Sequence, residues 1–357
     1  MTTAVFESIP VIDVAPLAGG GSPPAGLAGE LCTACHEVGF FLVVNHGIDD
    51  RLHNDVFDMM RRFFSLPDDA KRLIDKQASR HFRGWEPVGT EYTNNRPDIR
   101  EQIDCWTEWP ARGAGVEPGF LRLLGPNQWL PEGVLAGHEA LSNRWSDALA
   151  TLAVRLLGAL WHGLGLPASH LDRFIGDEPM SLTKFIHYPA TPPGAAGVNA
   201  HHDTGFLTIL ATGGVPGLQV QNPAGDWIDV PLVPGSLVVN LGESLQAMTG
   251  NYLVATPHRV ISSEERYSSG YFCGPSLGAP LDPLPLDARF ARAVAASTHH
   301  SAAGFMAPKD ELDAGVGDMA SDYRPGTYGE QLWNYFSRSY PEIVAHHYGV
   351  AASGVRS

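Results

Sequence analysis

The sequence between residues 181 and 273 consists of short β-rich segments, and this pattern restricts the fold more than any other feature. The segments are separated by glycine and proline and comprise Ser181–Tyr188, Gly205–Ala211, Gly217–Gln221, Trp227–Val230, Ser236–Leu241, Arg259–Ile261 and Gly270–Cys273. Many short strands at close spacing are typical of a barrel or jelly roll. We therefore expect such a core from about residue 179 onward.

The rest of the chain shows mainly helical periodicity. Helices are expected over Arg51–Ser65, from about residue 132 to 163, and over Tyr328–His346, with a loop or lid over residues 304–326 before the last one. The predicted fold is mainly β with α, a jelly-roll core with a helical N-terminal cap and a C-terminal helix. The expected regions are residues 1–178 for the cap, 179–290 for the core, and 291–357 for the lid and helix.

Composition and charge exclude several classes of protein. The 357 residues carry a net charge of −15, whereas proteins that bind nucleic acid or anionic membranes need a basic surface. The sequence has no apolar run of about 20 residues and does not begin like a signal peptide. Cys32 and Cys35 lie at helical spacing in an apolar segment, so we expect buried thiols in a reducing cytoplasm.

Two potential metal ligands begin one of the predicted strands. His201 and Asp203 are two residues apart, so on an extended chain both side chains point to one face and His202 points away. Another histidine, His258, follows 55 residues after Asp203, at the start of another strand. Two histidines and one carboxylate on one face of a metal, with positions left open, suit the non-haem Fe(II) oxygenases.

An arginine and a serine follow the second histidine in the same region. Arg266 and Ser268 are again two residues apart, so a guanidinium and a hydroxyl would point to one strand face. Such a pair can bind a carboxylate with two hydrogen bonds. A buried arginine without an anion is costly, so this position implies either a ligand or a structural carboxylate partner.

Several motifs in order resemble the isopenicillin N synthase-like branch of the Fe(II)/2-oxoglutarate-dependent oxygenases. The N-terminal part resembles the cap of that family in residues 9–13, 39–47 and 125–131, and the C-terminal part resembles its double-stranded β-helix in His201-x-Asp203, residues 217–220 and 240–243, His258-Arg259-Val260 and Arg266-x-Ser268. The resemblance extends over nearly the whole chain.

The resemblance implies an enzyme and its cofactors. Fe(II) would be held by His201, Asp203 and His258, with 2-oxoglutarate and O2 as cosubstrates and ascorbate as a stimulant. Arg266, Ser268 and Tyr188 would hold the distal carboxylate of 2-oxoglutarate. Ile186 stands where the family often has asparagine, and Glu243 where aspartate is common. Decarboxylation to succinate and CO2 would drive hydroxylation, desaturation or cyclisation of a small molecule, in a role typical of secondary metabolism.

Three other functions are compatible with parts of this pattern. An Fe(II) oxidase of the isopenicillin N synthase type would use no 2-oxo acid. A non-catalytic jelly-roll module could keep the metal without turnover. A zinc hydrolase could use the His-Asp-His set, but it would leave Arg266 and Ser268 without a role.

The substrate is expected to contact aromatic and charged residues, many of them from an irregular segment over residues 81–109. The candidates are Phe82, Trp85, Tyr92, Arg100, Trp106, Phe185, Phe206 and Phe272. The aromatic residues favour an apolar or aromatic small molecule, and Arg83, Arg96 and Arg100 leave room for an acidic one. This small molecule is the only expected partner, and no oligomeric state is indicated.

Overall fold

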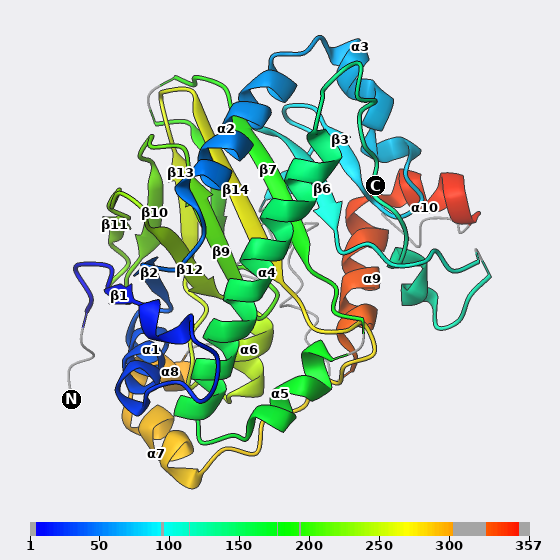
Figure 1. Ribbon diagram of the computed structural model, residues 1–357. Coiled ribbons are helices and arrows are strands. Elements are labelled where there is room, and N and C mark those ends of the chain that lie inside the picture. The colour runs from blue at the N-terminus through cyan, green and yellow to red at the C-terminus, as the bar shows by residue number, and fades with distance from the viewer. Residues whose placement is uncertain are drawn as a thin grey trace.

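The computed structural model describes residues 5–93, 96–113, 115–176, 178–192, 194–302 and 326–349. Two sheets form the centre of the protein (Figure 1). The larger sheet contains, in spatial order, β1 (Val11–Asp13), β2 (Phe40–Val44), β12 (Leu237–Leu241), β9 (Leu207–Thr212), β14 (Arg266–Cys273), β7 (Leu182–Tyr188), β6 (Glu101–Trp106) and β3 (Gly84–Glu86). The smaller sheet contains β11 (Trp227–Asp229), β10 (Leu218–Gln221), β13 (His258–Ile261) and β8 (Ala196–His201).

An apolar layer lies between strands of the two sheets. Phe40, Ile186 and Val238 from the larger sheet belong to the same buried cluster as Val198 and Val260 from the smaller one. Because successive side chains of a strand point to opposite faces, every second residue of these strands lies on the inner face between the sheets. The protein is a mixed α/β structure with large sheets, consistent with the expected jelly roll.

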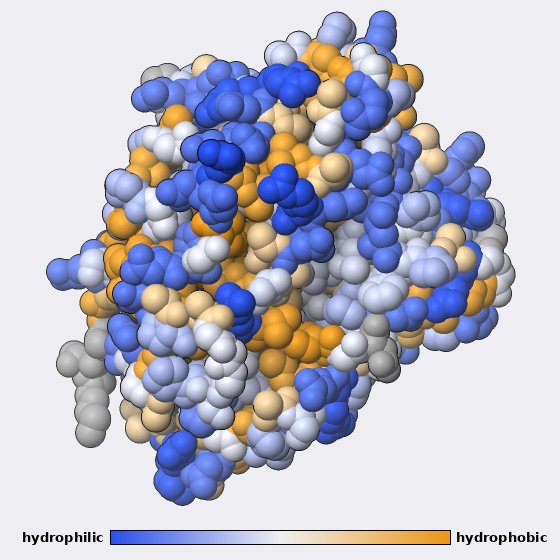
Figure 2. Space-filling model, viewed as in Figure 1, coloured by the Kyte–Doolittle hydropathy of each residue, from blue (hydrophilic) through white to orange (hydrophobic). Residues whose placement is uncertain are grey.

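Helices cover the outer face of the larger sheet. The long helix α4 (His138–Gly163) and α2 (Asp50–Phe64) lie across this face, and α1 (Ala25–Glu37) packs on α4 (Figure 1). Figure 2 shows this side as largely polar, with apolar side chains gathered near its middle. The other helices are α3 (Asp68–Lys71), α5 (Ala168–Ile175), α6 (Glu243–Met248), α7 (Ala288–Ala296), α8 (Thr298–Ala302), α9 (Tyr328–Ser339) and α10 (Pro341–Tyr348).

Several predicted boundaries differ from the structure. The long helix begins at His138 instead of about residue 132, after the left-handed Gly137 (φ 74°). The predicted C-terminal helix is two helices, because Pro341 lacks the N–H that would continue the first one and instead begins α10. The predicted lid over residues 304–326 falls, except for its last residue, outside the described part of the chain.

The segment over residues 81–109, predicted to be irregular, supplies strands. β6 pairs with β7 along its full length, from Glu101↔His187 to Trp106↔Leu182, and β3 pairs with β6. All six residues of β6 are buried, so its charged residues mask the usual apolar pattern of a strand. β1 and β2 also join the larger sheet, so strands from both sides of residue 178 share one sheet.

The two cysteines of the first helix are buried and free, as expected. Burial raises the pKa of the Cys32 thiol to about 11, despite the opposing charge of Arg289. No described helix is both long enough and apolar enough to cross a lipid bilayer.

Trp145 fixes α4 to the sheet and provides a stability test. Its side chain is fully buried and its indole N–H donates to Ser269 Oγ of β14 at 2.9 Å. Trp145→Ala should therefore lower the free energy of unfolding by about 3–5 kcal/mol in denaturant titrations. Val154→Ala is the control, because Val154 is 47% exposed on the same helix and should change stability by no more than about 0.5 kcal/mol. Equal effects of the two changes would contradict this packing.

His138 should make stability depend on pH. It lies against Phe63 and Trp129, and burial lowers its pKa to about 4. In the unfolded chain the imidazole of His138 takes up a proton at about pH 6.5. The contribution of the neutral, buried ring to folding stability is therefore fully present above that pH and is lost as the pH falls toward 4. Between pH 7 and pH 5 this residue should contribute a loss of about 2 kcal/mol. His138→Gln should reduce the pH dependence by that amount, and an unchanged pH profile would refute the assignment.

Candidate active site

Three potential metal ligands converge at the end of the smaller sheet. His201 is the last residue of β8 and pairs directly with His258, the first residue of β13. Asp203 follows β8 and forms a bridge with Gly242. Each imidazole Nε2 lies 3.6 Å from Asp203 Oδ1, and one ligand atom from each residue falls within 4.8 Å of the others. Donor atoms about 2.1 Å from one ion must lie within about 4 Å of each other, so the set fits a metal after small side-chain shifts.

The prediction that His201 and Asp203 lie on one face of a strand was only partly right. His201 and Asp203 do face one point, but they do not begin a strand, because β8 ends at His201 and β9 begins at Leu207. The intervening turn passes close to Gly242, where a Cβ atom would lie 2.2 Å from the carbonyl oxygen of Gly205. Only glycine permits this approach, and it brings Asp203 beside the two histidines.

Neighbouring groups occupy the outward atoms of all three ligands. His201 Nδ1 lies 2.9 Å from the carbonyl of Asn199, and His258 Nδ1 lies 3.2 Å from the carbonyl of Thr256. Asp203 Oδ2 accepts hydrogen bonds from Thr208 and Asn240. These contacts leave both Nε2 atoms and Oδ1 available for the metal and fix the ring orientations.

The protonation states also favour a metal. Burial lowers the pKa of His258 to about 4 and lowers that of His201, so both imidazoles are neutral near pH 7. Burial acts to raise the pKa of Asp203, but His258, His201 and the two hydrogen bonds outweigh it and lower the pKa below the usual value. Neutral imidazoles and an ionised carboxylate are the ligand forms that bind metals.

Arg266 lies buried between the sheets without a carboxylate partner. Its side chain is 1% exposed, its Nη1 donates to Ser268 Oγ at 3.2 Å, and its guanidinium carbon lies 4.9 Å from the centre of the Tyr188 ring. The register of β14 and β7 pairs Arg266 with Tyr188. Within the described part of the chain, Nε and Nη2 have no hydrogen-bond partner and no carboxylate forms an ion pair with this residue. Burial lowers the pKa of Arg266, and a buried cation of this kind needs an anion.

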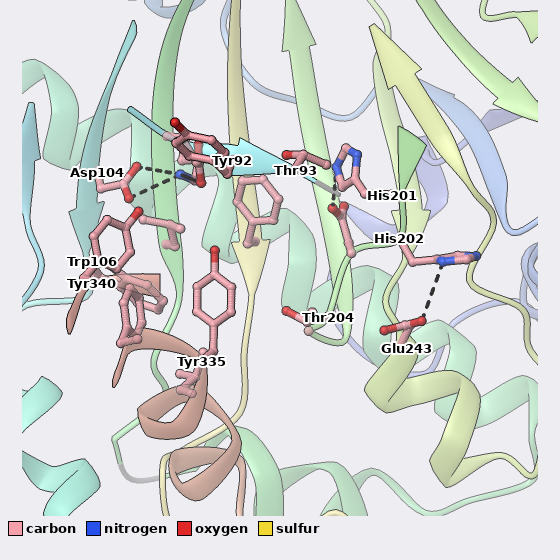
Figure 3. Close-up of a pocket in the computed structure, with 18 of the residues that line it drawn as sticks. Tyr92, Thr93, Asp104, Trp106, His201, His202, Thr204, Glu243, Tyr335 and Tyr340 are labelled. Atoms are coloured by element: carbon pink, nitrogen blue, oxygen red, sulfur yellow. Dashed lines mark hydrogen bonds and ion pairs between the residues drawn. The ribbon is translucent and has the colours of Figure 1, made fainter. Parts of the chain in front are cut away.

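A cavity next to the metal ligands contains half of the predicted substrate contacts. Tyr92, Arg100, Trp106 and Phe272 line it together with His201 and Asp203. Figure 3 shows Asp104, Trp106 and Tyr340 on one side, His201, His202 and Glu243 on the other, and the Tyr335 hydroxyl pointing into the space between them. His202 was predicted to point away from the metal ligands, but it lines this cavity, with Nδ1 3.6 Å from Glu243.

Four predicted substrate contacts do not line the cavity. Phe82 packs against Phe336 and Tyr340, and Phe206 packs against Trp161 and Phe174. The other two, Trp85 and Phe185, are also at most 1% exposed. Trp85 donates its indole N–H to Glu101 Oε2, and Phe185 belongs to the main core cluster. Their aromatic character reflects core packing, which sequence alone does not distinguish from a binding site.

Of the three arginines that left room for an acidic substrate, two already have partners within the protein and the third lies on the surface. Arg83 is fully buried and donates to the backbone carbonyls of His81 and Leu123. Arg96 lies exposed on β5 (Arg96–Pro97), which pairs with β4 (Tyr92–Thr93). Arg100 lies between Glu91 and Asp98.

The sequence interpretation missed one wall of the cavity. Tyr328, Leu332, Tyr335 and Phe336 of α9 line it, followed by Tyr340. The helical spacing of the last four residues places them on one face of the predicted C-terminal helix, but the spacing alone does not show that this face meets a cavity. Lys184 also lines the cavity, and a lysine on the same face of β7 as Ile186 and Tyr188 was a signal that could have identified it.

Two family models match the chain over its two halves. The model described as the N-terminal region of non-haem dioxygenases in morphine synthesis matches residues 9–132. The model of the 2OG-Fe(II) oxygenase superfamily matches residues 178–275, which contain His201, Asp203, His258, Arg266 and Ser268.

Individual relatives match over most of their length. The 2-oxoglutarate-dependent dioxygenase frbJ of Dothideomycetidae sp. (strain 11243) is 30% identical over 95% of this chain and 91% of its own. A homoarginine-6-hydroxylase of Oryza sativa subsp. japonica is 30% identical over 78% of this chain and 89% of its own. The crystal structure of a full-length Neurospora crassa protein in complex with alpha-KG and thymine shares the fold, with a TM-score of 0.72, 24% identity, and coverage of 95% of this chain and 100% of that one.

Removing a metal ligand should abolish metal binding without unfolding the protein. His258→Ala and Asp203→Ala should each weaken Fe(II) binding by more than about 100-fold, measured by anaerobic titration calorimetry, because even partners of metal ligands contribute about 10–100-fold. Asn240→Leu removes a hydrogen bond to Asp203 and should weaken Fe(II) binding by about 10–100-fold. The control is His346→Ala, which changes an exposed histidine of α10 and should leave the affinity unchanged. Fe(II) binding that persists in Asp203→Ala would refute the site.

Proposed function

Because the chain belongs to the isopenicillin N synthase-like superfamily of Fe(II)/2-oxoglutarate-dependent oxygenases, we propose that it hydroxylates a small molecule bound in the cavity beside the iron. Desaturation or cyclisation are other outcomes of the same hydrogen removal, and a role in secondary metabolism accords with a small-molecule substrate. Fe(II) and 2-oxoglutarate are its cofactor and cosubstrate. The observation that carries the proposal is the buried Arg266, which has no carboxylate partner among the described residues, together with the His-Asp-His set that fits a metal.

The donor set fits ferrous iron with room for ligands. Two imidazoles and one carboxylate occupy one side of the ion, which is the arrangement of non-haem Fe(II) oxygenases. When bound, Fe(II) with O2 and a 2-oxo acid supplies the oxidising power to remove hydrogen from a C–H bond, while the 2-oxo acid is converted to succinate and CO2. The contacts to Asn199, Thr256, Thr208 and Asn240 keep the three ligands oriented for this task.

The side chains of the chain determine which molecules are held and where. Arg266, with Ser268 and Tyr188, offers a fixed cation and hydroxyl donors to the distal carboxylate of 2-oxoglutarate. The rings of Phe272, Tyr328 and Phe336 exclude water from the cavity around the substrate. The protein would thus bind and orient two small molecules, 2-oxoglutarate through Arg266 and the substrate in the cavity.

The other candidate functions account for fewer of these observations. The named relatives are 2-oxoglutarate-dependent dioxygenases, which speaks against an oxidase that needs no 2-oxo acid and against a module without turnover. A zinc hydrolase would use the three metal ligands but would leave Arg266 buried with no anion to bind.

Binding of 2-oxoglutarate tests the proposal directly. Under anaerobic conditions, the wild type with Fe(II) and 2-oxoglutarate should show a weak visible metal-to-ligand charge-transfer band, and it should form succinate when O2 and substrate are added. Arg266→Met should weaken 2-oxoglutarate binding by about 100-fold, because two or more charged hydrogen bonds are lost, while Fe(II) affinity stays unchanged.

Arg289→Met is a matched control on the exposed side of α7, and it should leave the band and its concentration dependence as in the wild type. Absence of the band in the wild type, or an Arg266→Met variant that still binds 2-oxoglutarate normally, would exclude the proposed role.

A further inference from the structure

A chain of alternating charges runs from Asp104 and Lys184 in the cavity wall to Asp98, which lies beside the strand that ends at His201. Arg100 lies 2.5 Å from Glu91 and 3.0 Å from Asp98, and Lys184 lies 3.3 Å from Glu91 and 3.0 Å from Asp104. Behind them, Lys76 joins Asp104 to Glu86, each at 2.7 Å. We call these seven residues the charge chain. Its side chains are 12% exposed or less, so water screens it weakly.

Each cation of the charge chain is shared by two carboxylates. Lys184 and Arg100, the two basic residues of the chain that line the cavity, each contact a pair of acids. Burial acts to raise the pKa of Glu91, but Arg100 and Lys184 more than compensate and lower it, so Glu91 stays ionised. The positive charges of Arg100 and Lys184 are therefore already neutralised by carboxylates of the protein and are not available to an acidic substrate.

The side chains around the cavity leave an excess of negative charge. Apart from the metal ligands and His202, its described ionisable carboxylates and cations are Glu91, Asp104 and Glu243 against Arg100 and Lys184. The metal centre does not offset this excess, because Fe(II), Asp203, a 2-oxoglutarate dianion and Arg266 together carry no net charge. An anionic group in this cavity would meet an excess of carboxylates, whereas a cation would be stabilised.

Aromatic rings face the same space. Trp106, Tyr335 and Phe336 line the cavity beside Asp104, and Figure 3 shows Tyr335 extending from α9 toward its centre. Rings combined with carboxylates are the surroundings that bind organic cations, because the ring faces are electronegative. Trp106 is 6% exposed and its Nε1–H has no hydrogen-bond partner among the described residues, so an acceptor atom of the ligand, separate from any cationic group, would satisfy this donor.

We propose that the substrate of this oxygenase carries a cationic nitrogen group, an ammonium or a guanidinium, which binds in the cavity lined by Glu91, Asp104, Glu243 and the aromatic side chains of α9. This inference rests on the proposed function and specifies its substrate class. It differs from the apolar or aromatic substrate that the sequence favoured and from the acidic one for which the sequence left room.

Pairs of probes that share the α-amino acid group and differ in the charge of the side chain test the proposal. Protein with Fe(II) and 2-oxoglutarate is titrated anaerobically with L-arginine against L-citrulline, whose side chain is an uncharged isostere, and with L-lysine against Nε-acetyl-L-lysine. Dissociation constants come from calorimetry and from perturbation of the charge-transfer band. In at least one pair the cationic member should bind about 10- to 100-fold more tightly, and L-glutamate should bind more weakly than either cationic probe.

Two variants locate the preference. Glu91→Gln keeps the size of the side chain and should reduce the preference for the cationic member to within a few-fold, whereas Glu117→Gln, whose side chain is 77% exposed, should leave it unchanged. Tyr335→Leu keeps every charge and should weaken the cationic probes several-fold. If Glu91→Gln fails to fold, the wild-type comparison and Tyr335→Leu still decide the question.

The outcomes separate this inference from the proposed function. A missing charge-transfer band before any probe is added would contradict the proposed function. A normal band together with equal binding within both pairs, tighter binding of L-glutamate, or no binding of either cationic probe at millimolar concentration would overturn the inference alone.

Discussion

The antiparallel pairing of β8 with β13 is the interaction on which the site depends. It places His201 directly opposite His258, so two imidazoles from segments 57 residues apart meet without any help from loop geometry. The close approach of Gly205 and Gly242 then brings Asp203 to the same point. The metal geometry is therefore a property of sheet register, and a shift of either strand by one residue would turn a ligand to the opposite face.

The candidate metal ligands and the anion-binding pair could be predicted from the sequence, whereas most of the residues that line the cavity could not. The candidates for the metal and anion sites could be predicted, because His201 and His258 lie at strand ends and Arg266 and Ser268 lie on one strand, where spacing determines direction. Asp203 lies in the turn after β8, so its position depends on that turn as well. The strand Glu101–Trp106 could not be predicted, since buried ion pairs replace the apolar alternation from which strands are recognised. Aromatic residues were an equally poor guide, because a ring in the core and a ring at a site give the same pattern.

Buried ion pairs have a second effect on this structure. Lys76 joins Glu86 and Asp104 and also donates to the Tyr340 hydroxyl at the end of α9. The same group of charges that lines the cavity therefore attaches the C-terminal helix to the larger sheet. Breaking one member would leave others buried and unpaired, at a cost of several kcal/mol, so this wall has a defined shape before any substrate arrives.

The position of α9 separates two tasks that a compact enzyme must combine. The metal ligands and Arg266 lie on or beside strands whose register cannot change without destroying the fold, whereas a helix of 12 residues outside both sheets supplies much of the cavity surface. Replacing rings on that helix would alter the shape of the cavity while the strands stay as they are. New substrate ranges can thus arise by drift in a peripheral segment, with the oxidative machinery inherited intact.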